Sequence, residues 1–235
     1  MKQLVAFVFA AMALVTSAAA APYSTNFESF TLGPVHGQDG WVNDNVGDSA
    51  IAPVIVNDPT GGGHGKVLRI DPPIDELDYA WSGAFRACGN LVAEGATKLE
   101  LSWDQWRTDF IDNLWIVENP DLTGWQAQEW DGSMYPISTD LLPSTALSDQ
   151  QWQNIRLAFD VQAGTLEGFV DNVSFGVATG QTFDKFRGMD FQVMVTYGGV
   201  NGPNYIDNVN LTPEPATLAL LALGGLGPLR RRRTA

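Results

Sequence analysis

The chain has 235 residues, with 13 Lys and Arg against 27 Asp and Glu, two His, one Cys and eight Trp. Five of the bases, Lys2 and Arg230 to Arg233, lie at the ends, and Glu214 is the one acid of the tail. Residues 21–212 therefore carry eight bases against 26 acids, a net charge of −18. A surface this acidic repels phosphate backbones and excludes nucleic acid as a leading partner. A single Cys excludes a disulfide framework and a Cys-rich zinc site.

Residues 1–20 have the three parts of a secretory signal peptide. Lys2 supplies the positive charge, residues 4–15 form an apolar run, and Ala18 and Ala20 are the small residues before an expected cleavage after Ala20. The alternative, a permanent membrane helix, is disfavoured because such a helix needs about 20 apolar residues. The sequence therefore predicts that the protein is exported.

The body, residues 21–212, is predicted to be one all-β domain. Apolar and polar residues alternate with period two in segments 99–103, 155–159 and 191–197, as in strands with one buried face. Further strand candidates lie at 51–56, 67–70, 80–85, 113–117, 166–175 and 205–211, separated by clusters of Gly, Pro, Asn and Asp. Many short strands of this kind predict an antiparallel β-sandwich of the jelly-roll type, flanked by an N-terminal signal helix and a short C-terminal apolar helix.

Three segments resemble known jelly rolls. Residues 152–160, a turn at Ala163-Gly164, and residues 166–172 predict a hairpin similar to those of concanavalin A-like and laminin-G-like domains. Residues 26–28 and 37–41 resemble the opening of jelly-roll carbohydrate-binding modules, and residues 205–211 resemble their closing strand. The resemblance implies the fold more than an activity, because jelly rolls carry many unrelated functions.

The C-terminus combines a Pro-Glu-Pro triplet, the apolar segment 216–229 and a basic cluster. The sorting-motif residues are Pro213, Glu214, Pro215, Arg230, Arg231, Arg232 and Arg233. This order resembles the PEP-CTERM sorting signal of exported bacterial proteins. The resemblance implies processing by an exosortase-type enzyme, transient membrane insertion through the C-terminal segment, and a location at the cell envelope surface or in the extracellular matrix. The apolar segment makes only about 21 Å of helix, so whether it is cleaved or kept as an anchor stays open.

A calcium site is the first candidate for chemistry. In the carbohydrate-binding modules that the body resembles, a glutamate of the opening strand and an aspartate of the closing strand share Ca²⁺, and the matching residues are Glu28 and Asp207. First and last strands commonly pair in such sandwiches, and Ca²⁺ prefers carboxylate and carbonyl oxygens. The alternative is that Asp207 caps a strand and Glu28 is solvated.

The tryptophans are the second candidate, because an exposed indole ring can stack on a sugar. Trp106, Trp125 and Trp130 lie in or near the polar segment 104–132, outside clean alternation, so we expect them to be exposed and to bind glycan. Trp103 and Trp152 fit core positions. For each tryptophan a place in the core is the alternative, because large aromatic residues dominate β-sheet cores.

Signals for catalysis are few. Jelly-roll glucanases place two glutamates and an aspartate at alternate positions of one strand, and the nearest match, residues 100–104, lacks the second glutamate. His36 and His64 lie in separate Gly-rich turns, where we expect solvated side chains, and the lone Cys88 is expected to be a small buried residue. No catalytic residue is assigned. Carboxylates on separate strands still leave the question of an enzyme open.

These observations predict an exported, non-catalytic protein of the cell surface or extracellular matrix. We expect it to associate with exopolysaccharide and to bind glycan, with Ca²⁺ as a candidate cofactor. The alternative is a secreted glycan-active hydrolase or lyase of jelly-roll type. A matrix protein without a specific ligand is the third class.

Overall fold

The computed structural model describes residues 22–47, 50–74, 80–108, 112–117, 125–130, 133–138, 140–141, 145–180, 183, 186, 188–194 and 202–215. The described residues between 112 and 146, together with residues 194 and 215, are described by their backbone alone. The signal segment 1–20 and the tail after Pro215, including Arg230 to Arg233, lie outside the described residues, and so do the two flanking helices that the sequence predicts. Across these described ranges, no helix has the length and apolar character to cross a membrane.

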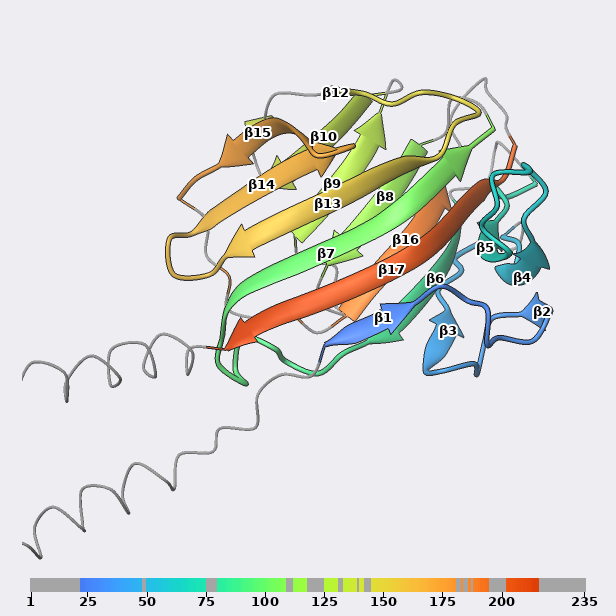
Figure 1. Ribbon diagram of the computed structural model, residues 1–235, viewed down its shortest axis with the longest axis horizontal. Coiled ribbons are helices and arrows are strands. Elements are labelled where there is room, and N and C mark those ends of the chain that lie inside the picture. The colour runs from blue at the N-terminus through green and yellow to red at the C-terminus, as the bar shows by residue number, and fades with distance from the viewer. Residues whose placement is uncertain are drawn as a thin grey trace, which may run out of the picture.

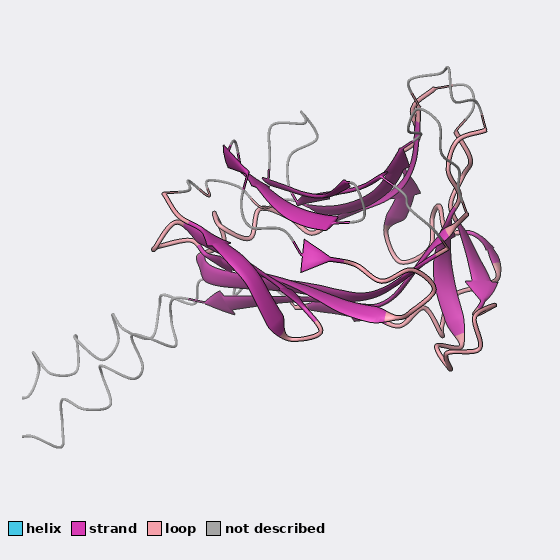
Figure 2. Ribbon diagram, turned by 90° about the horizontal axis from the view of Figure 1, so that it is seen from above, coloured by secondary structure: helices cyan, strands magenta, loops and turns pink. Residues whose placement is uncertain are grey.

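The described chain folds into two stacked antiparallel sheets, which confirms the all-β, two-sheet sandwich (Figures 1 and 2). The nine-stranded sheet has the order β15-β14-β13-β7-β17-β5-β4-β2, with β1 also paired to β17. Its strands are β1 (Tyr23–Thr25), β2 (Gly33–Pro34), β4 (Val54–Asn57), β5 (Lys66–Ile70), β7 (Ala96–Arg107), β13 (Gln153–Asp160), β14 (Thr165–Val170), β15 (Val173–Ala178) and β17 (Asn204–Pro215).

The eight-stranded sheet has the order β11-β10-β9-β8-β16-β6-β3, with β12 also paired to β10. It lies behind the nine-stranded sheet in the view of Figure 1. Its strands are β3 (Trp41–Asn43), β6 (Trp81–Ala87), β8 (Asp112–Val117), β9 (Trp125–Trp130), β10 (Ser133–Ser138), β11 (Asp140–Leu141), β12 (Thr145–Ala146) and β16 (Gly188–Met194).

Most of the predicted strands correspond to observed ones, including the hairpin of β13 and β14. The candidate 166–175 is two strands rather than one, because the chain reverses between β14 and β15. Asp171 and Asn172 form this turn with φ of 50° and 65°, a left-handed conformation that Asp and Asn tolerate better than other residues with side chains. The first and last strands pair as expected, with Tyr23 opposite Leu211 and Thr25 opposite Val209.

A β-bulge in β17 decides which of its side chains enter the core. Asp207 lies opposite Asp104 of β7, but Asn210 lies opposite Ser102, so β17 has one extra residue at this point. Asn208 lies at the bulge and has a left-handed backbone conformation, with a φ of 49°. As a result Ile206 and Val209 both point into the core with 0% exposure, while Asp207, Asn208 and Asn210 belong to the outer face.

The core joins the two sheets through aromatic rings. Trp103 of β7 and Phe191 of β16 meet edge to face at 5.4 Å, and Trp41 of β3 stacks on Phe191 at 6.0 Å. All three side chains are 0–1% exposed. Phe191 therefore contacts Trp41 within its own eight-stranded sheet and Trp103 of the opposite sheet. The core position expected for Trp103 is confirmed.

We expect Phe191→Ala to lower the free energy of unfolding by about 3–5 kcal/mol, because it removes a buried ring between two tryptophans. Equilibrium urea unfolding measures this change. Ile74→Ala is the control, since Ile74 is 80% exposed and should change stability by less than about 0.5 kcal/mol. Equal effects of the two substitutions would contradict the assignment of Phe191 to the core.

Candidate functional site

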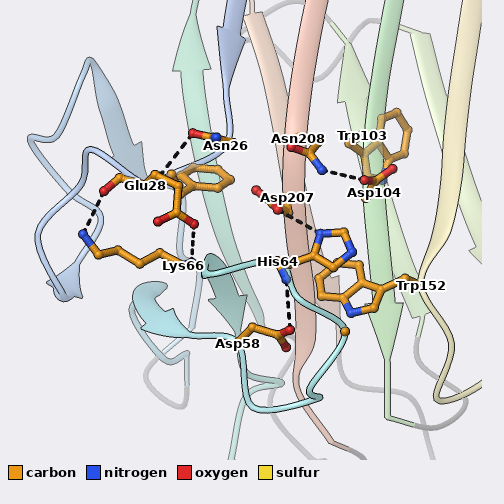
Figure 3. Close-up of polar contacts among 12 residues, drawn as sticks. Asn26, Glu28, Asp58, His64, Lys66, Trp103, Asp104, Trp152, Asp207 and Asn208 are labelled. Carbon is orange, nitrogen blue, oxygen red and sulfur yellow. Dashed lines mark hydrogen bonds and ion pairs between the residues drawn. The ribbon is translucent and has the colours of Figure 1, made fainter.

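The loop between β4 and β5 folds back over the outer face of the nine-stranded sheet and is held by Asp58 (Figure 3). The Asp58 Oδ1 atom accepts hydrogen bonds from the Thr60 amide at 2.8 Å and the Thr60 hydroxyl at 2.6 Å. The other carboxylate oxygen accepts from the His64 amide at 3.3 Å. Partial burial alone would raise the pKa of Asp58, but these hydrogen bonds outweigh it and lower the pKa below its ordinary value.

His64 is fixed between an aspartate and a tryptophan. Its Nδ1 atom lies 2.9 Å from Asp207 Oδ2, and its ring stacks on Trp152 with centroids 3.8 Å apart. The Trp152 Nε1 atom donates to the Thr60 hydroxyl at 2.9 Å. A Cβ atom on Gly62 would lie only 2.5 Å from the Trp152 ring, so this glycine allows the loop to approach.

Two expectations are corrected by this arrangement. His64 is not a solvated loop histidine, because its side chain is only 16% exposed and is joined to Asp207. Trp152 is not a core residue but is half-buried on the outer face. The sequence pattern missed both because the partners are far apart along the chain.

Asp207 is a buried carboxyl group beneath this loop. The residue is 2% exposed, and its Oδ1 atom has no hydrogen-bond partner in the described part of the chain. Burial raises its pKa to about 6, and the nearby Asp104 carboxylate adds to the rise. Hydrogen bonds from the Asn208 amide and from His64 act in the opposite direction and limit the shift.

Two asparagines hold Asp104, the neighbour of Asp207 across the strands. Asn208 donates its side-chain amide to Asp104 Oδ2 at 2.7 Å, and Asn154 donates to Oδ1 at 2.8 Å. The backbone amide of Asn154 in turn donates to Asp171 at 2.9 Å. Each side chain of this row therefore has a fixed orientation on the outer face, as Figure 3 shows for Asp104 and Asn208.

A polar hollow lies beside this row, where β1, β7 and β17 run together. Its volume is about 530 Å³, within the range of about 300–1,000 Å³ that is usual for small-ligand sites. The lining residues carry hydroxyl or amide groups: Ser24, Thr25, Asn26, Ser102, Asn208 and Asn210. Such groups both donate and accept hydrogen bonds, which is what the hydroxyl groups of a sugar require.

The proposed calcium ligands have separate partners. Glu28 accepts a hydrogen bond from the Lys66 amide at 2.8 Å, and a Cβ on Gly65 would collide with this carboxylate. Asp207 instead joins His64. Within the described ranges, no three His, Cys, Asp or Glu side chains form a metal-binding group. The described residues therefore add no third His, Cys, Asp or Glu ligand to Glu28 and Asp207, and calcium binding by this pair stays a prediction.

Of the three tryptophans predicted to bind glycan, only Trp106 has a described side chain, so the platform stays a prediction. Trp106 of β7 is half-buried, and its ring lies 5.5 Å from the ring of Tyr205. Trp125 and Trp130 begin and end β9, and their side chains lie outside the described part of the structure.

Sequence reasoning also missed four polar residues of this face. They are Asp104, Asn154, Asn208 and Asn210. The sequence did contain a signal for Asn208 and Asn210. The apolar residues 206, 209 and 211 are spaced by three and then by two, whereas a regular strand would space them by two throughout, and the extra residue indicates the bulge.

Several solved structures with a similar fold are lectins. The fold is similar to lectin UEA-II, solved in complex with galactose, with a TM-score of 0.55 and 7% identity over 84% of this chain and 100% of the lectin. The fold is also similar to the basic winged bean lectin solved with Tn-antigen, with a TM-score of 0.53 and 8% identity over 83% of this chain and 98% of the lectin. A sialidase matches with a TM-score of 0.59 and 11% identity over 83% of this chain. The chain spans only 18% of the length of the sialidase. At identities of 7–11%, these structural similarities establish the fold alone, a lectin-like two-sheet sandwich. No family model and no curated protein matches the sequence.

The raised pKa of Asp207 predicts a pH dependence of stability. The native state holds this proton more tightly than the unfolded chain between about pH 4 and pH 6, so the free energy of unfolding should fall as the pH rises through that window. We expect Asp207→Asn to remove about 1–3 kcal/mol of this fall, measured by urea unfolding in a chelator-containing buffer. Substitution of the exposed Glu94 by Gln is the control. Parallel pH profiles for the parent and Asp207→Asn would show that Asp207 does not titrate in this range.

Proposed function

We propose that this chain is an exported, non-catalytic glycan-binding protein that associates with extracellular polysaccharide at the cell surface or in the matrix. The polar hollow at the β17 bulge carries the proposal. It is lined by hydroxyl and amide groups from three adjacent strands and lies next to the fixed row of Asp104, Asn154 and Asn208. The lectin-like fold and the sugar complexes of two similar lectins support the same function.

The hollow can bind sugar hydroxyls without much reorganisation. Asn208 already donates its amide NH₂ to Asp104, so its amide oxygen is left as an acceptor toward a ligand. Ser102 and Asn210 lie opposite one another on β7 and β17, which fixes two further polar groups at one strand spacing. Groups that are held before binding lose less conformational entropy when the ligand arrives.

The location is supported by the two ends of the sequence. The signal peptide would export the chain, and the PEP-CTERM resemblance would direct it to an exosortase-type enzyme. The described part of β17 runs through Pro213 and Glu214 to Pro215 and pairs with β7 over these residues. The described part of the chain thus reaches the start of the apolar segment, so a tail inserted in the membrane would hold the domain close to the membrane surface.

A glycan array followed by calorimetry tests the function. We expect the double variant Ser102→Ala, Asn210→Ala to bind the best array ligand about 5–100-fold more weakly, because two hydrogen-bonding groups of the hollow are lost. Gln162→Ala, in the exposed β13–β14 turn, is the matched control and should bind like the parent. A parent protein that binds no glycan, or a double variant with unchanged affinity, would refute the assignment.

A second hollow favours the hydrolase as the alternative function. It has a volume of about 460 Å³ on the same face, and Glu100, Asp160, Glu167 and Glu214 contribute carboxylates to it. Glu100 of β7 and Glu167 of β14 both lie opposite Ala158, so one strand separates them. Two strand spacings are about 10 Å, close to the separation of about 6.5–9.5 Å between the carboxyl groups of inverting glycosidases.

The two functions predict different products. A binding protein releases no new reducing ends from the host exopolysaccharide, and this is the result we expect. Release by the parent that is lost in both Glu100→Gln and Glu167→Gln would establish the hydrolase instead. Arg156, which contacts Glu100 at 3.0 Å, offers a control, because Arg156→Lys keeps the positive charge and both carboxylates.

A further inference from the structure

The eight-stranded sheet has two carboxyl groups on its outer side, away from the hollows described above. In β16, Met189, Phe191 and Val193 point into the core with 0–1% exposure, so the alternation places Asp190 and Gln192 on the opposite face. That face would normally contact water, yet Asp190 is 7% exposed and Gln192 is 2% exposed. Another part of the chain must therefore cover them.

The cover is the segment that follows β3, residues 44–47. The Asp44 amide donates to the Gly83 carbonyl at 2.8 Å, and Val46 and Trp81 exchange two backbone hydrogen bonds of 3.0 Å. A Cβ on Gly83 would lie 2.6 Å from the Asp44 carbonyl oxygen, so only glycine permits this contact. The segment thereby brings the Asp44 carboxylate over β16.

Asp44, Asp190 and Gln192 converge on one point. The Gln192 Nε2 atom lies 2.7 Å from Asp44 Oδ2 and 2.8 Å from Asp190 Oδ2. The other oxygen of Asp190, Oδ1, is buried and has no hydrogen-bond partner among the described residues. Ile116 and Leu114 of β8 are in register with Asp190 and Gln192 and bring no charge to the cluster.

The two carboxyl groups of this cluster are not neutralised by the side chains that donate hydrogen bonds to them in the described structure. Burial, and then the nearby Asp44 carboxylate, raise the pKa of Asp190 well above its ordinary value. Asp190 is buried and Asp44 is half-buried, and the described side-chain donors to their Oδ2 atoms, the Gln192 amide and the Trp81 indole, are neutral. The two carboxylates therefore need either a shared proton or a cation between them.

We propose that Asp44, Asp190 and Gln192 form a binding site for a divalent cation of the Ca²⁺ type. If the Gln192 amide turns by 180°, its oxygen replaces its nitrogen and lies next to both Oδ2 atoms. Oxygens with that spacing can share one ion at Ca–O distances of about 2.3–2.6 Å. The unpartnered Asp190 Oδ1 supplies a fourth oxygen, and water completes the coordination from the side of Asp44, which is half-buried rather than enclosed.

The ion would join residues 44–47 to β16 and take the place of the shared proton. Binding then releases that proton to the buffer. The Trp81 Nε1 atom, 3.4 Å from Asp44 Oδ2, stands next to the ion. The site uses neither Glu28 nor Asp207, so it is independent of the calcium predicted from the sequence and of glycan binding.

Terbium, a luminescent substitute for Ca²⁺, provides the test on the full-length chain. We expect Tb³⁺ to emit when tryptophan is excited, and added Ca²⁺ to quench this emission by competition. Asp190→Asn should weaken Ca²⁺ binding in calorimetry by at least about tenfold, the loss expected when one ion ligand is neutralised. Trp81→Phe should reduce the emission but keep the calorimetric binding, and Glu94→Gln, at an exposed residue outside both candidate calcium sites, should change neither.

Proton release on Ca²⁺ binding tests whether the ion replaces a proton that Asp44 and Asp190 share. Near neutral pH, the heat of Ca²⁺ binding should depend on the ionisation enthalpy of the buffer in the parent and not in Asp190→Asn. Circular dichroism checks that the variant is folded, and Asp44→Asn, at the half-exposed ligand, serves as a second variant if it is not. No Ca²⁺ or Tb³⁺ binding by the parent, or unchanged affinity in a folded Asp190→Asn or Asp44→Asn, would overturn the proposal.

Discussion

The pairing of β17 with β7, and the bulge within it, is the constraint on which the outer face depends. Without the extra residue at Asn208, strict alternation after Ile206 would direct Asn208 and Asn210 into the core and Val209 and Leu211 into water. The bulge instead keeps Val209 buried and moves the asparagines outward. The register of the two strands ahead of the bulge places Asp207 opposite Asp104, so core packing and site geometry depend on the same pair of strands.

Both outer faces use the same physical device to bury carboxylates. A short segment crosses the face, and a glycine lets it approach: Gly62 against Trp152 on one sheet, and Gly83 against the Asp44 carbonyl on the other. Each segment excludes water from an aspartate, Asp207 or Asp190, and one oxygen of each aspartate has no hydrogen-bond partner among the residues that the structure describes. Burial at such a cost in desolvation is characteristic of functional positions, where it sets protonation and ion affinity.

The fold could be predicted from the sequence because period-two alternation is a local signal. Segments 99–103 and 155–159 became β7 and β13 in adjacent positions, and the pairing of the first and last strands followed from the sandwich itself. The site could not be predicted as well. His64 and Asp207 are 143 residues apart, and a Gly-rich loop gives no indication of the face on which it folds. The tryptophans illustrate the same limit, because alternation placed Trp103 correctly and Trp152 wrongly.

The central claim is that glycan binds the outer face of the nine-stranded sheet at the bulge. Backbone amide chemical shifts, recorded with and without the best array ligand, test it most directly. The account predicts that the largest changes cluster at the residues that line the hollow and at their neighbours in the bulge, with residues of β6 and β16 unaffected. Changes that cluster on the eight-stranded sheet, or in the hollow around Glu100 and Glu167, would contradict it.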